Sequence, residues 1–332
     1  MLETELEQKT TETGPPPGPR IAGLGVALPE RVVTNAPIAE RLGVKPDWIT
    51  KRTGVRERRV ADPDVTLVDM ATQAARAALD DAGFAAESID LLLLATSTNE
   101  MLCPAGGPVV AANIGADRAG AFDLNSACNG FLSGLSLAAS QIETGRANNV
   151  LVIGADMMQR FIDQDDRTTA GIFADGGGAV VMAGDKGPGR IGPVVLGADG
   201  GSGHLVQASR KEAITRMKGH ETFQLAVDKI CESTTEAMAL AGCEQEEIDL
   251  FVYHQANARI LASVGDRLGL PAEKVVECID RFGNTSSGSL PIALNDARED
   301  GLLNEGDKVL IGAFGGGMTW GATVIEWGRR EA

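Results

Sequence analysis

Long apolar runs recur along the chain and are separated by charged or Gly-containing segments. The four clearest runs are largely apolar at consecutive positions, without the alternation of a strand that has one face in water. They cover residues 89–95, 150–154, 248–253 and 309–313. This pattern is typical of strands in sheets that are covered on both faces. We therefore predict an α/β protein with helices between and outside two mainly parallel sheets.

The pattern also repeats within the chain. The motif Ile-Asp-Leu opens one run at Asp90 and another at Asp249, which lies 159 positions later. The same offset carries the motif VLVIGAD onto VLIGAFG, and Cys128 onto Ser287. Alternation of helix and strand is common to all α/β proteins, but it does not explain a constant offset. We therefore predict two copies of one α/β unit.

The predicted duplication divides the chain into two units. Residues 20–185 form the first unit and residues 186–332 the second, and an acidic, Pro-rich tail of residues 1–19 is expected to be disordered. The first unit carries extra segments at 30–60 and 156–175. Insertions in one copy of a duplicated scaffold are natural places for substrate-binding elements.

Composition narrows the possible functions. The 332 residues carry a net charge of −16, which argues against nucleic acid or an anionic membrane surface as a partner. Five widely spaced cysteines make neither a disulfide framework nor a zinc motif, and the three histidines are scattered, so we expect no metal site. No apolar run reaches membrane-spanning length, and the N-terminus lacks signal or transit features. We therefore expect a cytoplasmic protein.

One cysteine lies in a context that favours reactivity. Cys128 follows the strand-like segment AGAFDL and precedes an apolar, helix-like run. A lone cysteine more often packs as an inert core residue. Asn125 and Ser126 are cap-type residues, however, and they place Cys128 in the first turn of a helix. Free N–H groups and the helix dipole at such a position lower the pKa of a thiol. We therefore predict a nucleophile at Cys128.

Three further motifs stand at predicted strand ends or helix starts. They are YHQAN with His254, GNTSSG with Asn284, and FGGGMTWG at residues 314–321. Singly, each has a structural explanation as a core histidine, a helix cap or a glycine turn. The duplication relates the Asn284 turn to the Cys128 turn, and α/β folds bind ligands at strand ends. Together the four motifs predict one site.

Six motifs resemble those of the thiolase superfamily, and most closely those of β-ketoacyl-acyl-carrier-protein synthase III. They are PDWITKRTGVRERR, FDLNSACNGF, FADGGGA, HQANARI, GNTSSGS and AFGGGMTWG, and the resemblance covers about residues 20–330. It implies a thiolase-like fold of duplicated α/β units in five layers, αβαβα. It also implies that Cys128 is the acylated nucleophile and that His254 and Asn284 complete the triad. The N–H groups of Cys128 and Gly316 are implied to form an oxyanion hole.

The resemblance assigns contacts with coenzyme A at one end of the site. It implies that Trp48 and Arg167 stack on the adenine and that Arg52 lies beside them. It implies that Asn257 contacts the pantetheine arm. A flat cation and an indole are both suited to stacking on a purine. Both stacking residues lie in the extra segments of the first unit.

The resemblance also implies an acyl pocket, a carrier-protein surface and a homodimer. Phe314 shapes the pocket, and Cys103 closes its end from across the dimer interface, where many short-chain members carry Phe. Arg259 and Arg267 match basic residues that dock acyl carrier protein. Two further positions where Lys is common carry Gln and Asp here, which should slow association with an acidic carrier.

The implied reaction joins two thioesters. An acyl-CoA substrate acylates Cys128, a malonyl thioester on acyl carrier protein loses CO2, and the carbanion attacks the acyl group to give a 3-oxoacyl product, without a cofactor. Such a step starts fatty-acid or polyketide synthesis. Two alternatives stay open: transfer of the acyl group to another acceptor as an ester, and hydrolysis by a Cys-His thioesterase. The wider tunnel end at Cys103 predicts that branched, aromatic or medium-chain primers are accepted at least as well as acetyl-CoA, unless neighbouring residues fill the space.

Overall fold

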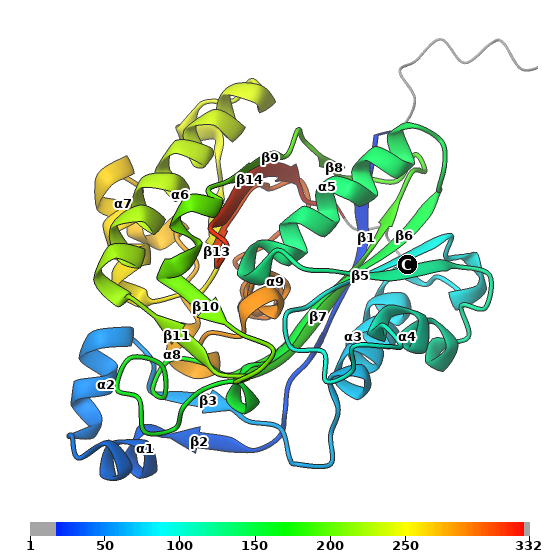
Figure 1. Ribbon diagram of the computed structural model, residues 1–332. Coiled ribbons are helices and arrows are strands. Elements are labelled where there is room, and N and C mark those ends of the chain that lie inside the picture. Colours follow the sequence, from blue (N-terminus) through cyan, green and yellow to red (C-terminus); the bar gives the residue numbers. More distant parts are fainter. Residues whose placement is uncertain (1–17, 329–332) are drawn as a thin grey trace, which may run out of the picture.

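The computed structural model describes residues 18–328, which form two sheets with helices on each face (Figure 1). The first sheet has the order β1-β7-β6-β4-β5, in which β7 is antiparallel to both neighbours and β6, β4 and β5 are parallel. Its strands are β1 (Arg20–Ala27), β4 (Leu91–Ala95), β5 (Gly120–Leu124), β6 (Asn149–Met157) and β7 (Asp175–Ala183). Residues 1–17 of the predicted tail, which is expected to cover residues 1–19, lie outside the described residues.

The second sheet has the order β12-β13-β14-β8, with β9 also paired to β14. Here β12 and β13 are parallel, and β14 is antiparallel to all its partners. The strands are β8 (Arg190–Ile191), β9 (Val195–Ala198), β12 (Leu250–Tyr253), β13 (Lys308–Gly315) and β14 (Thr319–Glu326). The chain therefore enters this sheet soon after it leaves β7.

The helices complete five layers. Helices α5 (Gly130–Glu143) and α9 (Ser289–Glu299) share one core with apolar side chains of both sheets, so they form the central layer (Figure 1). The second face of the first sheet packs on α3 (Leu67–Ala82) and α4 (Gly106–Ile114). The second face of the other sheet packs on α6 (Gly219–Ala241) and α7 (Ala258–Leu268). None of the helices in residues 18–328 is long and apolar enough to cross a membrane.

Small residues bring α3 onto the first sheet. Its buried face is built largely of alanines, and a Cβ at Gly25 of β1 would lie 2.2 Å from the backbone nitrogen of Ala78. Thr66 and Asp69 form a capping box at the start of the helix, and Gly83 ends it in the left-handed conformation. Close backbone contact, fixed at both ends, therefore positions this layer.

The repeat read from the sequence is visible in matching hydrogen bonds. The carboxylate of Asp90 accepts from the N–H of Asn149 at 3.1 Å, and that of Asp249 accepts from the N–H of Lys308 at 2.9 Å. Each bond joins the start of a central strand to the residue before its neighbour. The same offset of 159 separates both members of the two pairs, so the two units share this construction.

The extra segments of the first unit pack against each other at one side of the molecule (Figure 1). The first contains β2 (Val32–Thr34), α1 (Asn35–Leu42), α2 (Pro46–Thr53) and β3 (Glu57–Arg59). Arg58 is fully buried there and donates to Asn35 Oδ1 at 2.7 Å and to the carbonyl of Gly171, in the second segment, at 2.9 Å. Apart from short 3-10 helices, the remaining elements between residues 18 and 328 are the hairpin β10 (Val206–Ala208) and β11 (Thr215–Met217) and the short helix α8 (Ile279–Phe282).

Candidate active site

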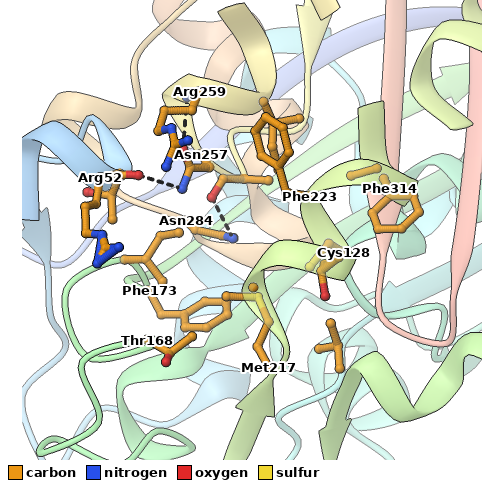
Figure 2. A pocket seen from close by; sticks show the side chains of 18 of the residues that line it. Arg52, Cys128, Thr168, Phe173, Met217, Phe223, Asn257, Arg259, Asn284 and Phe314 are labelled. Atoms are coloured by element: carbon orange, nitrogen blue, oxygen red, sulfur yellow. Dashed lines mark hydrogen bonds between the residues drawn. The ribbon is translucent and has the colours of Figure 1, made fainter. Parts of the chain in front are cut away.

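A cavity of about 880 Å³ lies where the two units and the extra segments meet (Figure 2). Ten of the twelve residues singled out from the sequence line it: Trp48, Arg52, Cys128, Arg167, His254, Asn257, Arg259, Asn284, Phe314 and Gly316. Cys103 and Arg267 do not. Residues that are distant in sequence thus converge on one space, with Cys128 and Phe314 on one side and Arg52 on the other.

Cys128 lies in a 3-10 turn, Ala127–Asn129, between β5 and α5. The predicted low thiol pKa is wrong, because burial raises the pKa of Cys128 to about 11. A side-chain hydrogen bond from Ser286 lowers it, and the negative charge of Asp156 raises it. Removal of water from the thiolate therefore outweighs the hydrogen bonds at the helix start. The free protein holds Cys128 as a thiol at neutral pH.

Two backbone N–H groups interact with the Cys128 sulfur. The N–H groups of Cys128 and Gly316 both stabilise negative charge on the Cys128 sulfur. The tightest packing is at Gly315, where a Cβ would lie 2.8 Å from the backbone nitrogen of Cys128 and 2.9 Å from that of Asn129. The sequence singled out Gly316, but the close approach of β13 to the cysteine turn depends on Gly315.

His254 is held neutral at the end of β12. Its side chain is 2% exposed, and burial lowers its pKa to about 3. Its backbone N–H donates to the carbonyl of Gly312 at 2.8 Å, and its Nδ1 has no hydrogen-bond partner among residues 18–328. With no carboxylate behind the ring to favour the charged form, the imidazole is neutral at pH 7.

Asn284 is fixed by bonds on both sides. Its backbone bridges Ile172 and Ala174, with N···O distances of 2.9 Å at both ends. Its Oδ1 accepts from the N–H of Ser286 at 2.9 Å, and its Nδ2 donates weakly to the carbonyl of Ala256 at 3.4 Å (Figure 2). The amide therefore presents a donor to the cavity that also holds Cys128.

The residues implied to contact coenzyme A meet at the mouth of the cavity. The guanidinium of Arg52 lies 4.7 Å from the centre of the Trp48 ring. Arg167 donates to the carbonyl of Leu42 at 2.9 Å. Asn257 caps α7 through its Oδ1 and donates from Nδ2 to the carbonyl of Arg52 at 3.1 Å (Figure 2). In this structure the Arg52 guanidinium lies over the Trp48 ring, while Arg167 of the second extra segment is hydrogen-bonded to the first.

Cys103 and Arg267 lie apart from the cavity. Cys103 is exposed in the segment before α4, beside Met101 and Leu102, which are 57% and 76% exposed. Arg267 is paired with Asp228 of α6. Of the two residues implied to dock a carrier protein, only Arg259 lies at the mouth.

Several lining residues escaped the sequence analysis. Most are apolar and come from separate loops and strands: Phe173, Val206, Met217, Phe223 and Met318. No periodic pattern marks such residues, because each belongs to a different element. The Ser286 hydroxyl was also missed, although it lies in the same motif as Asn284.

Comparison with known proteins places this geometry in a family context. Family models described as 3-oxoacyl-[acyl-carrier-protein (ACP)] synthase III and as its C terminal match residues 122–212 and 238–327. Beta-ketoacyl-[acyl-carrier-protein] synthase III 1 of Bacillus cereus is 43% identical over 311 residues, which is 93% of this chain and 99% of the relative.

Solved structures agree with the sequence matches. The crystal structure of 3-oxoacyl-[acyl-carrier-protein] synthase III from Aquifex aeolicus VF5 superimposes with a TM-score of 0.91 at 41% identity, covering 93% of this chain and all of that one. The priming β-ketosynthase from the R1128 polyketide biosynthetic pathway gives 0.90 at 34% identity, covering 96% and 99%. The similarity therefore extends through both units.

Proposed function

The chain belongs to the β-ketoacyl-acyl-carrier-protein synthase III family of condensing enzymes and has its thiolase-like fold, and from this premise we propose that it condenses an acyl-CoA with a malonyl thioester on acyl carrier protein. The observation that supports this proposal is the convergence of Cys128, a neutral His254 and Asn284 in one cavity. Relatives bear the names of both fatty-acid and polyketide enzymes, so the proposal covers a starting step in either kind of synthesis.

The first half-reaction transfers the acyl group. The Cys128 sulfur attacks the acyl-CoA carbonyl, the carbon–sulfur bond to coenzyme A breaks, and the thiol proton leaves with the coenzyme A thiolate. The N–H groups of Cys128 and Gly316 stabilise the oxyanion of the tetrahedral intermediate. One thioester replaces another, so the step is nearly isoenergetic. Trp48, Arg52, Arg167 and Asn257 would hold the coenzyme at the mouth.

The second half-reaction forms the carbon–carbon bond. The malonyl carboxylate leaves as CO2, and the electrons of that bond form an enolate on the thioester. The imidazole of His254 and the amide of Asn284 stabilise its oxygen as hydrogen-bond donors. The carbanion attacks the acyl-Cys128 carbonyl, and the departing Cys128 thiolate takes a proton from solvent. Loss of CO2 generates the carbanion, so no general base is needed.

The neutral histidine disfavours the hydrolytic alternative. A thioesterase must remove a proton from water, and an imidazole with a pKa of about 3 is a weak base at pH 7. Among residues 18–328, Nδ1 of His254 also has no carboxylate partner that would support an imidazolium. Transfer to another acceptor with ester formation remains the second candidate, since its acylation step would be identical.

The two half-reactions can be tested separately. Intact-mass spectrometry after incubation with acyl-CoA donors should show one acyl group on Cys128 and none on Cys128→Ala. His254→Ala and Asn284→Ala should still become acylated but should not release 14CO2 from labelled malonyl carrier protein. Acyl mass on Cys231 or Cys243, or unchanged CO2 release in both variants, would refute the assigned roles.

The proposal includes a homodimer. Strand β5 is an edge of the first sheet, and Phe122 on it is 43% exposed. An exposed edge strand with a large apolar side chain favours pairing with a second copy. Sedimentation should show a dimer, and a fully active monomer at assay concentration would reject it. The unit boundaries at residues 20, 185 and 332 and the cytoplasmic location stay predictions.

A further inference from the structure

The duplication creates two related turns in the middle of the molecule. Residues Ala127–Asn129 precede α5, and residues Ser286–Gly288 precede α9. Their first residues share a rare left-handed conformation, with φ of 48° at Ala127 and 52° at Ser286. The offset of 159 places Ser287 on the position of Cys128. Each turn contacts the end of a central strand from the other unit, β13 for the first turn and β6 for the second.

The two strand ends carry different residues at the position that faces the turn. Gly315 of β13 faces the Cys128 turn, and its counterpart by the same offset, Asp156 of β6, faces the Ser287 turn. Asp156 Oδ2 accepts from the backbone N–H of Ser287 at 3.0 Å and from its hydroxyl at 2.6 Å. Gly315 has no side chain that could bond to the Cys128 N–H, so this N–H stays available for a substrate oxygen. In the second unit a carboxylate of the protein already occupies the corresponding N–H.

The rest of the second site is also filled from within. The counterpart of Gly316 is Met157, whose N–H donates to the Thr98 hydroxyl at 2.8 Å. The counterpart of His254 is Ala95, whose carbonyl accepts from the Ser287 hydroxyl at 2.9 Å. The second of the two related sites therefore has Ala95 and Ser287 where the first has His254 and Cys128, and internal groups accept from both related N–H donors.

Asp156 is fully buried and extensively hydrogen-bonded. Its Oδ1 accepts from the segment that follows β4: from the Thr96 hydroxyl at 3.2 Å, the Ser97 N–H at 2.9 Å and the Thr98 hydroxyl at 2.9 Å. A buried carboxylate is costly unless such bonds are made. Oδ1 of Asp156 therefore bonds to the first unit, whereas Oδ2 bonds to the Ser287 turn of the second unit.

The turn at residues 284–288, which Asp156 holds, carries two groups of the candidate active site. The two turns contact each other, and the Ser286 side chain, next to Ser287, lowers the pKa of the Cys128 thiol. The Ser286 N–H also donates to Asn284 Oδ1 at 2.9 Å. We propose that Asp156 is a positioning residue that holds the 284–288 turn so that the Ser286 hydroxyl and the Asn284 amide reach the reacting atoms. The Asn284 part rests on the proposed function; the contact between Ser286 and Cys128 does not.

The test replaces the carboxylate by an amide of the same shape. In Asp156→Asn an NH2 group replaces one carboxylate oxygen and faces the donors that this oxygen had accepted from. The hydrogen bonds that hold Ser287 therefore become weaker. If Asp156 positions the turn, iodoacetamide should alkylate Cys128 of Asp156→Asn about tenfold more slowly at pH 8, because the thiolate loses the Ser286 hydrogen bond. If Asp156 acts only through its charge, alkylation should become faster, since that charge raises the pKa of Cys128. The sign of the change decides between these roles.

Two controls separate positioning from general stability. Thr96→Val removes a donor to the same carboxylate without touching the turn, so it should lower Tm but leave alkylation and condensation rates near those of the unaltered protein. In the double variant of Asp156→Asn with Ser286→Ala, the two effects on alkylation should not add. If Asp156→Asn does not fold, Ser287→Ala removes one of the two bonds to Oδ2 and should slow alkylation in the same direction.

Condensation rates provide a second measure. Displacement of a reacting group by about 1 Å can lower a rate about 10²-fold, and we expect a loss of this size in Asp156→Asn. Alkylation that is unchanged or faster, or that adds fully to Ser286→Ala, would overturn the proposal. Alkylation needs neither acyl-CoA nor malonyl carrier protein. If the unaltered protein shows no condensation activity but Asp156→Asn is alkylated more slowly than the unaltered protein, the proposed function is contradicted and the positioning role is supported.

Discussion

At the scale of single residues, the Cys128 thiol illustrates a competition that the sequence does not resolve. The cap-type residues before it correctly placed it at a helix start, where N–H groups favour a thiolate. Burial depends on the walls of the cavity, which come from other parts of the chain. Those walls raise the pKa of the thiol to about 11. The place of Cys128 before a helix was therefore predictable from local sequence, and its resting protonation state was not.

The raised pKa predicts a specific pH dependence. Only about 10⁻⁴ of Cys128 is thiolate at pH 7, so its rate of alkylation by iodoacetamide should rise steadily with pH and should not level off below pH 9. Stopped alkylation with peptide mapping measures this rate at each pH. A plateau between pH 6 and 8 would indicate a thiolate–imidazolium pair with His254 and would contradict the neutral pair described here.

The glycine that faces Cys128 predicts a second outcome. In Gly315→Ala the new Cβ would lie 2.8 Å from the backbone nitrogen of Cys128 and block the oxyanion site. Acylation by acyl-CoA should fall by about 10²-fold or more. The comparison is Gly316→Ala, whose Cβ would have the side chains of Val206 at 3.3 Å and Ala127 at 3.7 Å as its nearest neighbours, and no backbone nitrogen among them. Equal losses in the two variants would show that the approach at residue 315 is not the sensitive one.

At the scale of elements, continuous apolar runs located the central strands well. The runs at 150–154 and 309–313 became β6 (Asn149–Met157) and β13 (Lys308–Gly315). The antiparallel strands β7 and β14 were harder to recognise, because glycines at 176–178 and 321 weaken the strand signal. Such glycines are required by neighbours: a Cβ at Gly178 would lie 2.7 Å from Pro291 of α9. This requirement is tertiary and leaves no local pattern.

The two extra segments predict an effect confined to the coenzyme end of the site. Arg58 joins them, and its burial lowers its pKa to about 10. Arg58→Met should loosen the support of Trp48 and Arg167 and raise KM for acyl-CoA roughly tenfold. Acylation by an acyl thioester of N-acetylcysteamine, which lacks the nucleotide, should change little. The control is Arg59→Met, because Arg59 donates to the carbonyl of Pro29, just before its own segment, and not to the second segment as Arg58 does.

Kinetics with both donors decide the outcome. Equal losses for acyl-CoA and for the truncated thioester in Arg58→Met would show that Arg58 supports the whole protein, without a specific effect on the coenzyme end. An unchanged KM for acyl-CoA would show that the extra segments hold their positions without this arginine.

At the scale of the whole molecule, the constant offset of 159 predicted a duplicated fold, and the family assignment confirms that fold. The sequence could not show that the two related turns meet in the centre, or that Asp156 and Gly315 make one site internal and leave the other open. Those relations depend on how the two units face each other. Cys103 is a further example: it is exposed and does not line the cavity of its own chain, so its expected place in an acyl pocket depends on the proposed partner subunit.

The proposed dimer gives Cys103 a measurable role in primer choice. If it closes the partner's acyl tunnel, Cys103→Phe should shorten the tunnel and shift kcat/KM from octanoyl-CoA toward acetyl-CoA. One methylene is worth about 1 kcal/mol or more of discrimination, so the ratio should change by at least about tenfold. Steady-state assays with both donors measure it. A wild type that strongly prefers acetyl-CoA, with an unchanged ratio in the variant, would show that neighbouring residues already fill the space.

Carbon–carbon bond formation tests the central claim most directly. Purified protein is incubated with one acyl-CoA and with malonyl carrier protein labelled at the carboxylate that is lost, and products are quantified by mass spectrometry and trapped 14CO2. Decarboxylative condensation predicts one 3-oxoacyl carrier protein and one CO2 for each coenzyme A released, and none of these products from Cys128→Ala. Release of coenzyme A with formation of a free acid or an ester, and without CO2 or a 3-oxoacyl product, would contradict it.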